Sequence, residues 1–486
     1  MIELDGRSLG SAEVARIAAG EGAALAQGAR TRMEASASAF ASLPSVLVQK
    51  RKYLVGEGEP GGDLVRAFVL GHCAGVGEPL PPGQVRALIA CRANVLASGH
   101  SGVRPALVDA LLALLDTPPV VPSQGSVGAA GDLAPLAHLA RVLCGYGGEV
   151  NANGTRGPWA GVPFAPTHKE ALSLINGATL SAALGALACA RARHVVERAV
   201  EACALTMAAL HADPRALSPA LHAARGHAGP QRVATRLREL LGPGRPLRPP
   251  DAFSIRAAPA VLGAALDALD WVESTVVTEL NGACDNPLWF ADEGVVEGGN
   301  FHGAPVALAM DTLRVAMTQV ATVSERRTFR LTGASLTGDL PSFLVEGTGL
   351  NSGFMLAQYT AASLASECKG LSHPASVDSI PTVQHHEDHV SMGPIAARLA
   401  LRVVENVADI VAIELLLAAQ ALDWRLRGAR FVDGARVDGE PEAFAAGIMA
   451  LHAEVRGAVA FWPDDQLMHP ALVAVGRLVR GGVVGW

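Results

Sequence analysis

Apolar residues recur with helical spacing along most of the chain after residue 165. Stripes of several turns predict helices over residues 170–211, 254–280, 302–328, 348–370 and 389–426. Each stripe is far longer than the average helix of about 11 residues. Amphipathic helices of this length bury their apolar faces against one another. The pattern therefore predicts a bundle of long helices.

Proline and glycine interrupt the stripes at residues 242–250, at 286–287 with 294–299, and at 373–381. Such breaks let polar side chains leave the bundle and converge on a site. The first 165 residues instead mix short apolar runs with glycine-rich segments such as GEGEPGG at residues 56–62. We therefore expect a mainly α protein with a mixed N-terminal part, residues 1–165, and a long-helix bundle, residues 166–486, which form one continuous unit.

The composition adds the expectation of an oligomer. Charged residues make up 17% of the chain and hydrophobic residues 50%, whereas typical soluble domains carry about 25% charged residues. We infer that other copies of the chain cover much of the surface. Residues 171–190 and 348–366 carry no charge, but they are rich in Ala, Gly, Ser and Thr, so we expect buried bundle helices and no membrane span.

The net charge, the N-terminal residues and the cysteines argue against a nucleic-acid-binding, a secreted and a zinc-binding protein. The formal net charge is −7 and no basic run with interleaved aromatics occurs, so we expect no nucleic-acid partner. The first residues include Glu3 and Asp5 and show no secretory signal, which favours the cytoplasm. The seven cysteines never form a CxxC pair, so we expect reduced thiols and no zinc site. A small-molecule or protein partner is left.

A glycine-dense segment, GSVGAAGDLAPLAH at residues 125–138, suggests a backbone that reacts with itself. In a tight turn, the amide nitrogen of a glycine can attack the carbonyl two residues earlier and close an imidazolone ring, because glycine has no Cβ to block the approach. If the residue between them is serine, loss of its hydroxyl leaves a methylidene group. That group is a strong electrophile.

With this segment, the chain resembles the aromatic amino acid ammonia-lyases and aminomutases, and the histidine ammonia-lyases above all. The other stretches that carry the resemblance are GHCAGVGEPLPP (71–82), RANVLASGHSGVRP (92–105), SLINGATL (173–180), FSIRAAP (253–259), CDNPL with GGNFHGAPVA (284–307), and HPASVDSIPT with EDHVSMG (373–393). The resemblance implies the long central helical bundle of the histidine and phenylalanine ammonia-lyases. It also implies a homotetramer whose sites are each shared among three subunits, with helix N-termini aimed at the site.

The family forms its methylidene-imidazolone prosthetic group from an Ala-Ser-Gly tripeptide. The matching residues here are Ala129, Ala130 and Gly131. Because Ala130 has no hydroxyl to eliminate, we expect the prosthetic group to be absent, and we expect no other cofactor. The run QHHEDH at residues 384–389 could bind a metal by composition, but adjacent residues seldom point at one ion, so we predict no metal site.

The resemblance implies two retained substrate-binding residues. Asn176 matches the asparagine that contacts the prosthetic group and the amino acid, and Arg256 matches the arginine that binds the substrate carboxylate. The plainer alternative for each is a structural hydrogen bond at a helix end. Phe253 stands where the family has a tyrosine, and Pro250 where it has a glutamine, so one wall of the site has lost a hydroxyl and an amide.

Other residues match the pocket walls and the catalytic groups. Phe301, followed by His302, persists as pocket wall, and His386 is interpreted as part of a reshaped wall. The catalytic candidates are His72, which faces the substrate ring in the family, Glu387, which matches the glutamate of the histidine-specific members, and Tyr53. Tyr53 is the only candidate for the family's tyrosine base, although the Asn-Thr-Gly-Phe-Gly continuation that follows that base in the family is missing.

The sequence is compatible with three functions. The favoured one is an enzyme without the electrophile, which binds an amino acid or related carboxylic acid, free or carrier-linked, and performs non-standard lyase or isomerase chemistry with acid–base groups. The alternatives are a non-catalytic binding or partner subunit, and an ordinary histidine or aromatic amino acid ammonia-lyase inactivated by an engineered Ser-to-Ala change at 130. An engineered change would not explain Phe253 or Pro250, which favours natural divergence.

Overall fold

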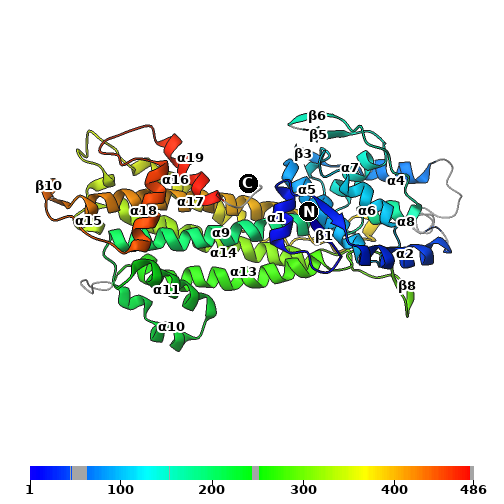
Figure 1. Ribbon diagram of the computed structural model, residues 1–486, viewed down its shortest axis with the longest axis horizontal. Coiled ribbons are helices and arrows are strands. Elements are labelled where there is room, and N and C mark those ends of the chain that lie inside the picture. Colours follow the sequence, from blue (N-terminus) through cyan, green and yellow to red (C-terminus); the bar gives the residue numbers. More distant parts are fainter. Residues whose placement is uncertain (44, 46–62, 153, 244–250, 482–486) are drawn as a thin grey trace.

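Long helices run side by side along the molecule and form its centre (Figure 1). They are α9 (Thr179–Ala209), α13 (Ala258–Leu280), α14 (Ala304–Thr332) and α17 (Gly393–Leu426). Helix α17 packs against both α9 and α14, and its 34 residues span about 50 Å at ~1.5 Å per residue. This computed structural model describes residues 1–43, 45, 63–152, 154–243 and 251–481.

Local sequence explains where these helices begin. In α13, α14 and α17 a proline occupies the first turn, where its missing N–H has no intrahelical partner to lose. Small residues then let the helices approach closely. Gly185 of α9, for example, leaves room for Val276 and Met310, both of which would lie within 3.4 Å of an added Cβ. The centre of the molecule is therefore a close-packed bundle rich in alanine.

A mixed layer made by the N-terminal part covers one end of the bundle (Figure 1). Its elements are β1 (Ile2–Leu4), α1 (Ser11–Ala18), β2 (Ala23–Leu25), α2 (Gln27–Ala41), α4 (Leu64–His72), β3 (Val76–Pro79), α5 (Pro82–Ala97), α6 (Pro105–Leu112), β4 (Pro122–Gln124), α7 (Leu133–Leu143), β5 (Glu149–Ala152), β6 (Thr155–Pro158) and α8 (His168–Ile175). The sheets are two-stranded: β1 and β2 pair in parallel, and β3–β4 and β5–β6 are antiparallel.

Shorter elements surround the rest of the bundle. They are η1 (Pro214–Leu217), α10 (Pro219–Arg225), α11 (Ala228–Leu241), α12 (Phe253–Arg256), β7 (Leu288–Phe290), β8 (Gly294–Val296), α15 (Ala334–Thr337), η2 (Ser342–Leu344), α16 (Met355–Leu371), η3 (Val383–His385), β9 (Ala429–Val432), β10 (Ala435–Asp438), α18 (Ala446–Ala458) and α19 (Met468–Arg480). β7 pairs with β8, and β9 with β10, in antiparallel fashion. Helices α10, α11 and α18 lie at the opposite end from the mixed layer (Figure 1).

The structure confirms the mainly α bundle and corrects two details. The stripe at residues 170–211 is two helices, α8 and α9, because the chain turns at Asn176 and Gly177. The uncharged stretch at residues 348–366 is only partly helical and only partly buried: α16 begins at Met355, and Leu350 is 91% exposed. The other uncharged stretch, residues 171–190, is buried almost throughout. The division at residue 165 stays a prediction.

Among the described helices, α14 is long and apolar enough to cross a membrane by length and composition alone. In this chain, 67% of its apolar window is buried inside the molecule. It packs against α13, α16 and α17. These contacts are those of a core helix in a bundle.

Candidate functional site

The loop at residues 129–131 lies where the mixed layer meets the bundle, and two neighbouring segments hold it. On one side, the N–H of Gly177 donates to the carbonyl of Ala130 at 3.2 Å. On the other side, the Ser391 hydroxyl donates to the carbonyl of Gly128 at 3.0 Å, and the N–H of Met392 donates to the carbonyl of Val127 at 2.8 Å. The loop is therefore clamped between the α8–α9 junction and the segment that leads into α17.

Gly131 occupies a position that only glycine can fill. Its φ is +87°, and an added Cβ would lie 2.2 to 2.4 Å from backbone atoms of Gly177. Both the left-handed backbone and the close approach exclude a side chain. Ala129, two residues earlier, is buried and small.

The residues present do not complete the family's prosthetic group. Ala129 and Gly131 fit their positions in the tripeptide, but the Ala130 side chain is a methyl group and holds no oxygen that could leave. The methylidene electrophile therefore cannot arise from this loop by dehydration. The glycine of the tripeptide is present, and the source of the electrophile is missing.

Asp132 anchors the loop to the start of α9. One carboxylate oxygen accepts the Ser181 N–H at 2.8 Å, and the Ser181 hydroxyl lies within 3.2 Å of both oxygens. Burial raises the pKa of Asp132 to about 7, against the opposing effect of the hydrogen bonds from Ser181. Glu279 adds a smaller repulsive contribution, and burial also raises the pKa of Glu279 itself. The uncharged form of Asp132 is thus favoured in acidic solution, and the two forms are about equally populated near neutral pH.

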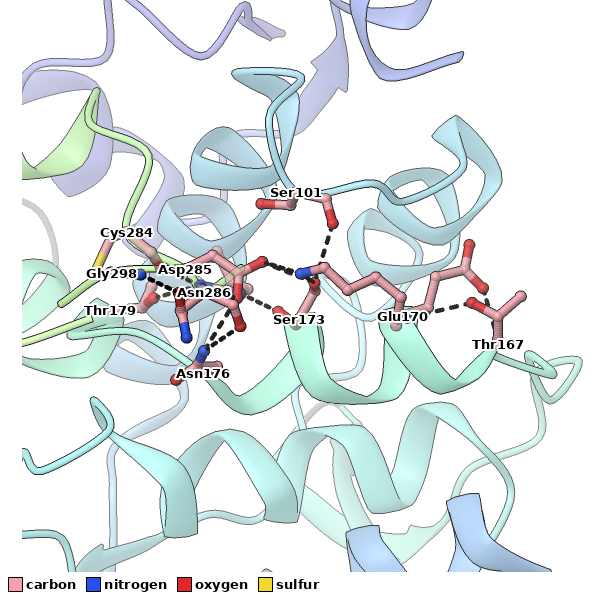
Figure 2. A network of polar contacts seen from close by, with 12 residues as sticks. Ser101, Thr167, Glu170, Ser173, Asn176, Thr179, Cys284, Asp285, Asn286 and Gly298 are labelled. Atoms are coloured by element: carbon pink, nitrogen blue, oxygen red, sulfur yellow. Dashed lines mark hydrogen bonds and ion pairs between the residues drawn. The ribbon is translucent and has the colours of Figure 1, made fainter. Parts of the chain in front are cut away.

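Asn176 is the last residue before the turn at Gly177 and belongs to a buried polar network (Figure 2). Its amide nitrogen donates to Asp285 Oδ1 at 3.2 Å and to the Asn286 carbonyl at 3.0 Å. Its amide oxygen is buried and has no hydrogen-bond partner among the described residues. Figure 2 shows that oxygen pointing away from Asp285. The network therefore leaves one buried acceptor unused next to the loop.

Asp285 is the centre of this network. Lys169 Nζ lies 3.0 Å from Asp285 Oδ2, and the Ser173 hydroxyl donates to the same oxygen at 2.7 Å. Burial alone would raise the pKa of Asp285, but the positive charges of Lys169 and Arg92 and the hydrogen bonds outweigh it and lower the pKa below its ordinary value. Asp285 is therefore an anion inside the protein, paired with a buried lysine.

His72 is the last residue of α4. Its Nδ1 lies 2.7 Å from the Phe68 carbonyl, so Nδ1 carries the proton and a neutral His72 has its lone pair on Nε2. Three residues later, the N–H of Gly75 donates to His138 Nε2 at 3.2 Å. Burial lowers the pKa of His138, which keeps that acceptor neutral. His138 thus fixes the segment that follows His72 against α7.

Glu387 lies in a tight turn before α17. Its carboxylate accepts the Thr382 hydroxyl at 2.6 Å, and the backbones of the two residues pair in both directions. Between them, Val383, Gln384 and His385 all have positive φ values, from 47° to 68°, which is a strained conformation for L-residues. In this turn Glu387 is half-buried, whereas the preceding residue, His386, is exposed.

Phe301 and His302 lie just before α14, close to the same turn. The His302 and His389 rings stack at 5.5 Å between centroids. Gly303 packs against Ser391, whose hydroxyl would lie 3.1 Å from an added Cβ. One end of the bundle therefore gathers the loop, Asn176, the α14 start and the Glu387 turn. No group of three or more His, Cys, Asp or Glu side chains suited to a metal ion occurs among the described residues.

Arg256 and Phe253 lie elsewhere, near the other end of α14. The carbonyl of Ser254 accepts a hydrogen bond from Arg327 at 3.4 Å, and the stretch of α14 from Ala304 to Arg327 spans about 35 Å at ~1.5 Å per residue. Phe253 is 72% exposed, and the Arg256 guanidinium lies 4.8 Å from its ring centroid. Within one chain, this arginine cannot reach the loop.

Two predicted positions, Tyr53 and Pro250, lie outside the described residues. Ser173 and Asp285 lie in the stretches SLINGATL and CDNPL that carry the resemblance, but no role was predicted for them or for Lys169. A signal for Lys169 and Ser173 was present, because Lys169, Ser173 and Asn176 are spaced i, i+4, i+7 and so share one face of α8. Asp285 is far from them in sequence, and only the folded chain reveals its place in the network.

The long-helix bundle, with a loop before α7 held between the α8–α9 junction and the segment that leads into α17, is the fold of the ammonia-lyases and aminomutases. Residues 57–456 match the family described as aromatic amino acid lyase, and the chain belongs to this family.

Several proteins with sequences similar to this chain are histidine ammonia-lyases. The enzyme from Anaeromyxobacter sp. (strain K) is 46% identical and the alignment covers 86% of this chain and 84% of that protein. The enzyme from Gloeobacter violaceus is 45% identical over 85% of this chain and 84% of its own length.

Solved structures with the same fold include a histidine ammonia-lyase and an aminomutase. The crystal structure of histidine ammonia-lyase from Trypanosoma cruzi superimposes with a TM-score of 0.88 and 38% identity, covering 99% of this chain and 94% of that one. Tyrosine aminomutase from Streptomyces globisporus gives a TM-score of 0.87 and 31% identity, covering 99% and 96%. The fold predicted from the sequence is therefore confirmed, and so is the family.

Proposed function

We propose that this chain binds histidine, or a closely similar imidazole amino acid, in a site of the histidine ammonia-lyase type, and that residue 130 alone withholds the elimination of ammonia. The observation that carries the proposal is the intact support around the loop: Gly131, Asp132 and Asn176 keep the contacts described above while Ala130 lacks the hydroxyl. The identity to histidine ammonia-lyases supports histidine as the ligand. This favours the ordinary-lyase alternative over the divergent enzyme.

The substrate site in this proposal needs more than one copy of the chain. Asn176 and the loop lie at one end of α14, and Arg256 lies near the other, too far away to bind the carboxylate of the same ligand. An apolar groove of about 370 Å³ between α13 and α14, with exposed Leu308, Val315 and Val377 along it, offers a surface for a neighbouring subunit. We therefore propose a homotetramer, in the cytoplasm, with sites completed between subunits.

A second candidate is the divergent enzyme, in which Glu387 and His72 perform acid–base chemistry without an electrophile. The tautomer of His72 supports it, because a neutral His72 offers its Nε2 lone pair as a proton acceptor. The Glu387 carboxylate is engaged with Thr382 and would have to exchange that partner for a ligand. Turnover by the unaltered chain is the observation that would favour this candidate.

Substitution of Ala130 separates the two functions. We expect Ala130→Ser to lose the mass of two water molecules, to gain near-UV absorbance from the new conjugated ring, and to release ammonia from histidine. Ala130→Gly, which also lacks a hydroxyl, is the matched control and should gain none of these. The unaltered chain should bind histidine without releasing ammonia.

Two results would contradict the proposal. A folded Ala130→Ser variant that gains neither absorbance nor ammonia release would show that the loop or the pocket no longer supports the family reaction. Conversion of histidine by the unaltered chain would assign the activity to acid–base groups and favour the second candidate. Calorimetric titration of the unaltered chain with histidine measures binding independently of either activity.

A further inference from the structure

We propose that Asp285 and Lys169 are positioning residues, which fix the amide of Asn176 so that its oxygen faces the ligand and accepts a hydrogen bond from the ligand's α-ammonium group. The inference rests on the proposed function, because it assumes an amino acid ligand. It adds two residues far from each other in sequence, 169 and 285, to the set that determines what this site binds.

The orientation of the Asn176 amide follows from its partners. Its nitrogen donates to two acceptors, Asp285 Oδ1 and the Asn286 carbonyl, at 3.2 and 3.0 Å. A flipped amide would place its oxygen against both of these acceptors. The flipped state is therefore disfavoured, and the oxygen is the atom left on the side away from Asp285 (Figure 2).

Asp285 can hold this orientation because its own position is fixed. Oδ1 also accepts the N–H of Asn286 at 2.7 Å, while Oδ2 is bonded to Lys169 and to the Ser173 hydroxyl. Lys169 donates in turn to Ser173 at 2.7 Å. The Lys169 and Asp285 side chains are 6% and 0% exposed, so water does not compete for these bonds, and a charge-assisted pair of this kind resists rotation.

The unused oxygen then identifies the ligand group. Buried polar atoms almost always have a hydrogen-bond partner, yet Asn176 Oδ1 has none among the described residues. An amide oxygen accepts and never donates, so it cannot pair with a carboxylate. Of the groups of an amino acid, the α-ammonium is donor-only and charged, and it makes the stronger hydrogen bond to such an acceptor.

Comparison of two ligands measures this contact. Histidine and 3-(imidazol-4-yl)propionate share the carboxylate and the ring and differ in the amino group, so the ratio of their calorimetric dissociation constants reports on the ammonium contact alone. We expect the unaltered chain to prefer histidine, and Asp285→Asn to reduce this preference at least about tenfold. Ser173→Ala, which removes one donor to Asp285 and disturbs folding less, should reduce it by a smaller factor.

Glu170→Gln is the matched control. Glu170 is 1% exposed, lies on the same helix, and is held by Arg104 and Thr167, away from Asn176. It should lower thermal stability while leaving the ligand preference unchanged. In a double-mutant cycle, Asp285→Asn should add nothing to the loss of preference caused by Asn176→Ala, because both act on the same oxygen.

The possible failures are distinguishable. If the unaltered chain binds neither ligand, the proposed function is wrong, and this inference falls with it. If the chain binds histidine but Asp285→Asn and Ser173→Ala keep the preference, or Glu170→Gln loses it equally, the network has only a structural role. If the unaltered chain binds both ligands equally, the oxygen does not meet the ammonium group.

Discussion

Substitution of Asp132 offers a direct test of the electrostatics that hold the loop. The Asp132 side chain is fully buried, and burial raises its pKa to about 7, whereas an unfolded aspartate titrates near 3.8. Between these two pH values the folded chain keeps a proton that the unfolded chain releases. The stability of the fold must therefore fall as pH rises from about 4 to about 7.

The expected size follows from the two pKa values. At about 1.36 kcal/mol per pH unit, the interval from 3.8 to about 7 corresponds to a loss of about 4 kcal/mol above neutral pH. For a chain of 486 residues, an unfolding entropy of about 2.1 cal/mol/K per residue converts this to about 4 °C in Tm. Asp132→Asn removes the titration and can keep the contacts with Ser181, since an amide both accepts an N–H and donates to a hydroxyl.

The assay is the difference in Tm between Asp132→Asn and the unaltered chain across pH 4 to 8. We expect the variant to gain stability relative to the unaltered chain, from near zero at pH 4 to about 4 °C at pH 8. Asp285→Asn is the control with the opposite sign. The pKa of Asp285 is lowered by Lys169 and Arg92 despite its burial, so this variant should be less stable by a constant amount over the same range. A flat difference for Asp132→Asn would refute the reasoning.

Two further predictions concern the loop and the proposed sharing of the site between subunits. Gly131→Ala should lower Tm more than Gly154→Ala. Both residues have positive φ, but only the Cβ added at 131 would lie within 2.4 Å of neighbouring backbone atoms, and overpacking of this kind costs about 1 to 3 kcal/mol. Equal decreases in Tm for the two variants would contradict the tight packing at Gly131. On the Ala130→Ser background, chains with Arg256→Ala and chains with Asn176→Ala should each be inactive alone and regain ammonia release when co-assembled. The absence of such complementation would argue that each site is built within one chain.

The long helices could be predicted from the sequence because their stripes repeat over many turns. The break at Asn176 was missed, since small apolar residues continue on both sides of it and the turn depends on Gly177, which approaches Cys284 from another part of the chain. The exposure of α16 was missed for a different reason. Hydrophobic residues predict burial, but they do not say whether the covering surface belongs to the same chain or to another one.

Sequence motifs predicted individual residues of the candidate site, but they did not predict how these residues are arranged in space. Asn176 and the loop at residues 129–131 lie together as the resemblance implies. Arg256 was assigned to the same pocket, yet in one chain it lies near the other end of α14. Asp285 lies in the CDNPL stretch, but its pairing with Lys169 was not predictable, because a salt bridge between distant residues depends on how the chain folds.

The two departures from the family pattern, Ala130 and Phe253, should affect the site in different ways. Ala130 lies in a loop held by hydrogen bonds from Gly177, Ser391 and Met392, so we expect the missing hydroxyl to be a local chemical loss that one substitution reverses. Phe253, in contrast, is 72% exposed and contacts Arg256 in the isolated chain, so in the proposed tetramer its effect depends on the neighbouring subunit. If Ala130→Ser restores the ring but not ammonia release, the defect lies outside the loop, and recovery of turnover by Phe253→Tyr on that background would place it at this second wall. The order in which absorbance and activity return thus separates the loss of the electrophile from the loss of the pocket.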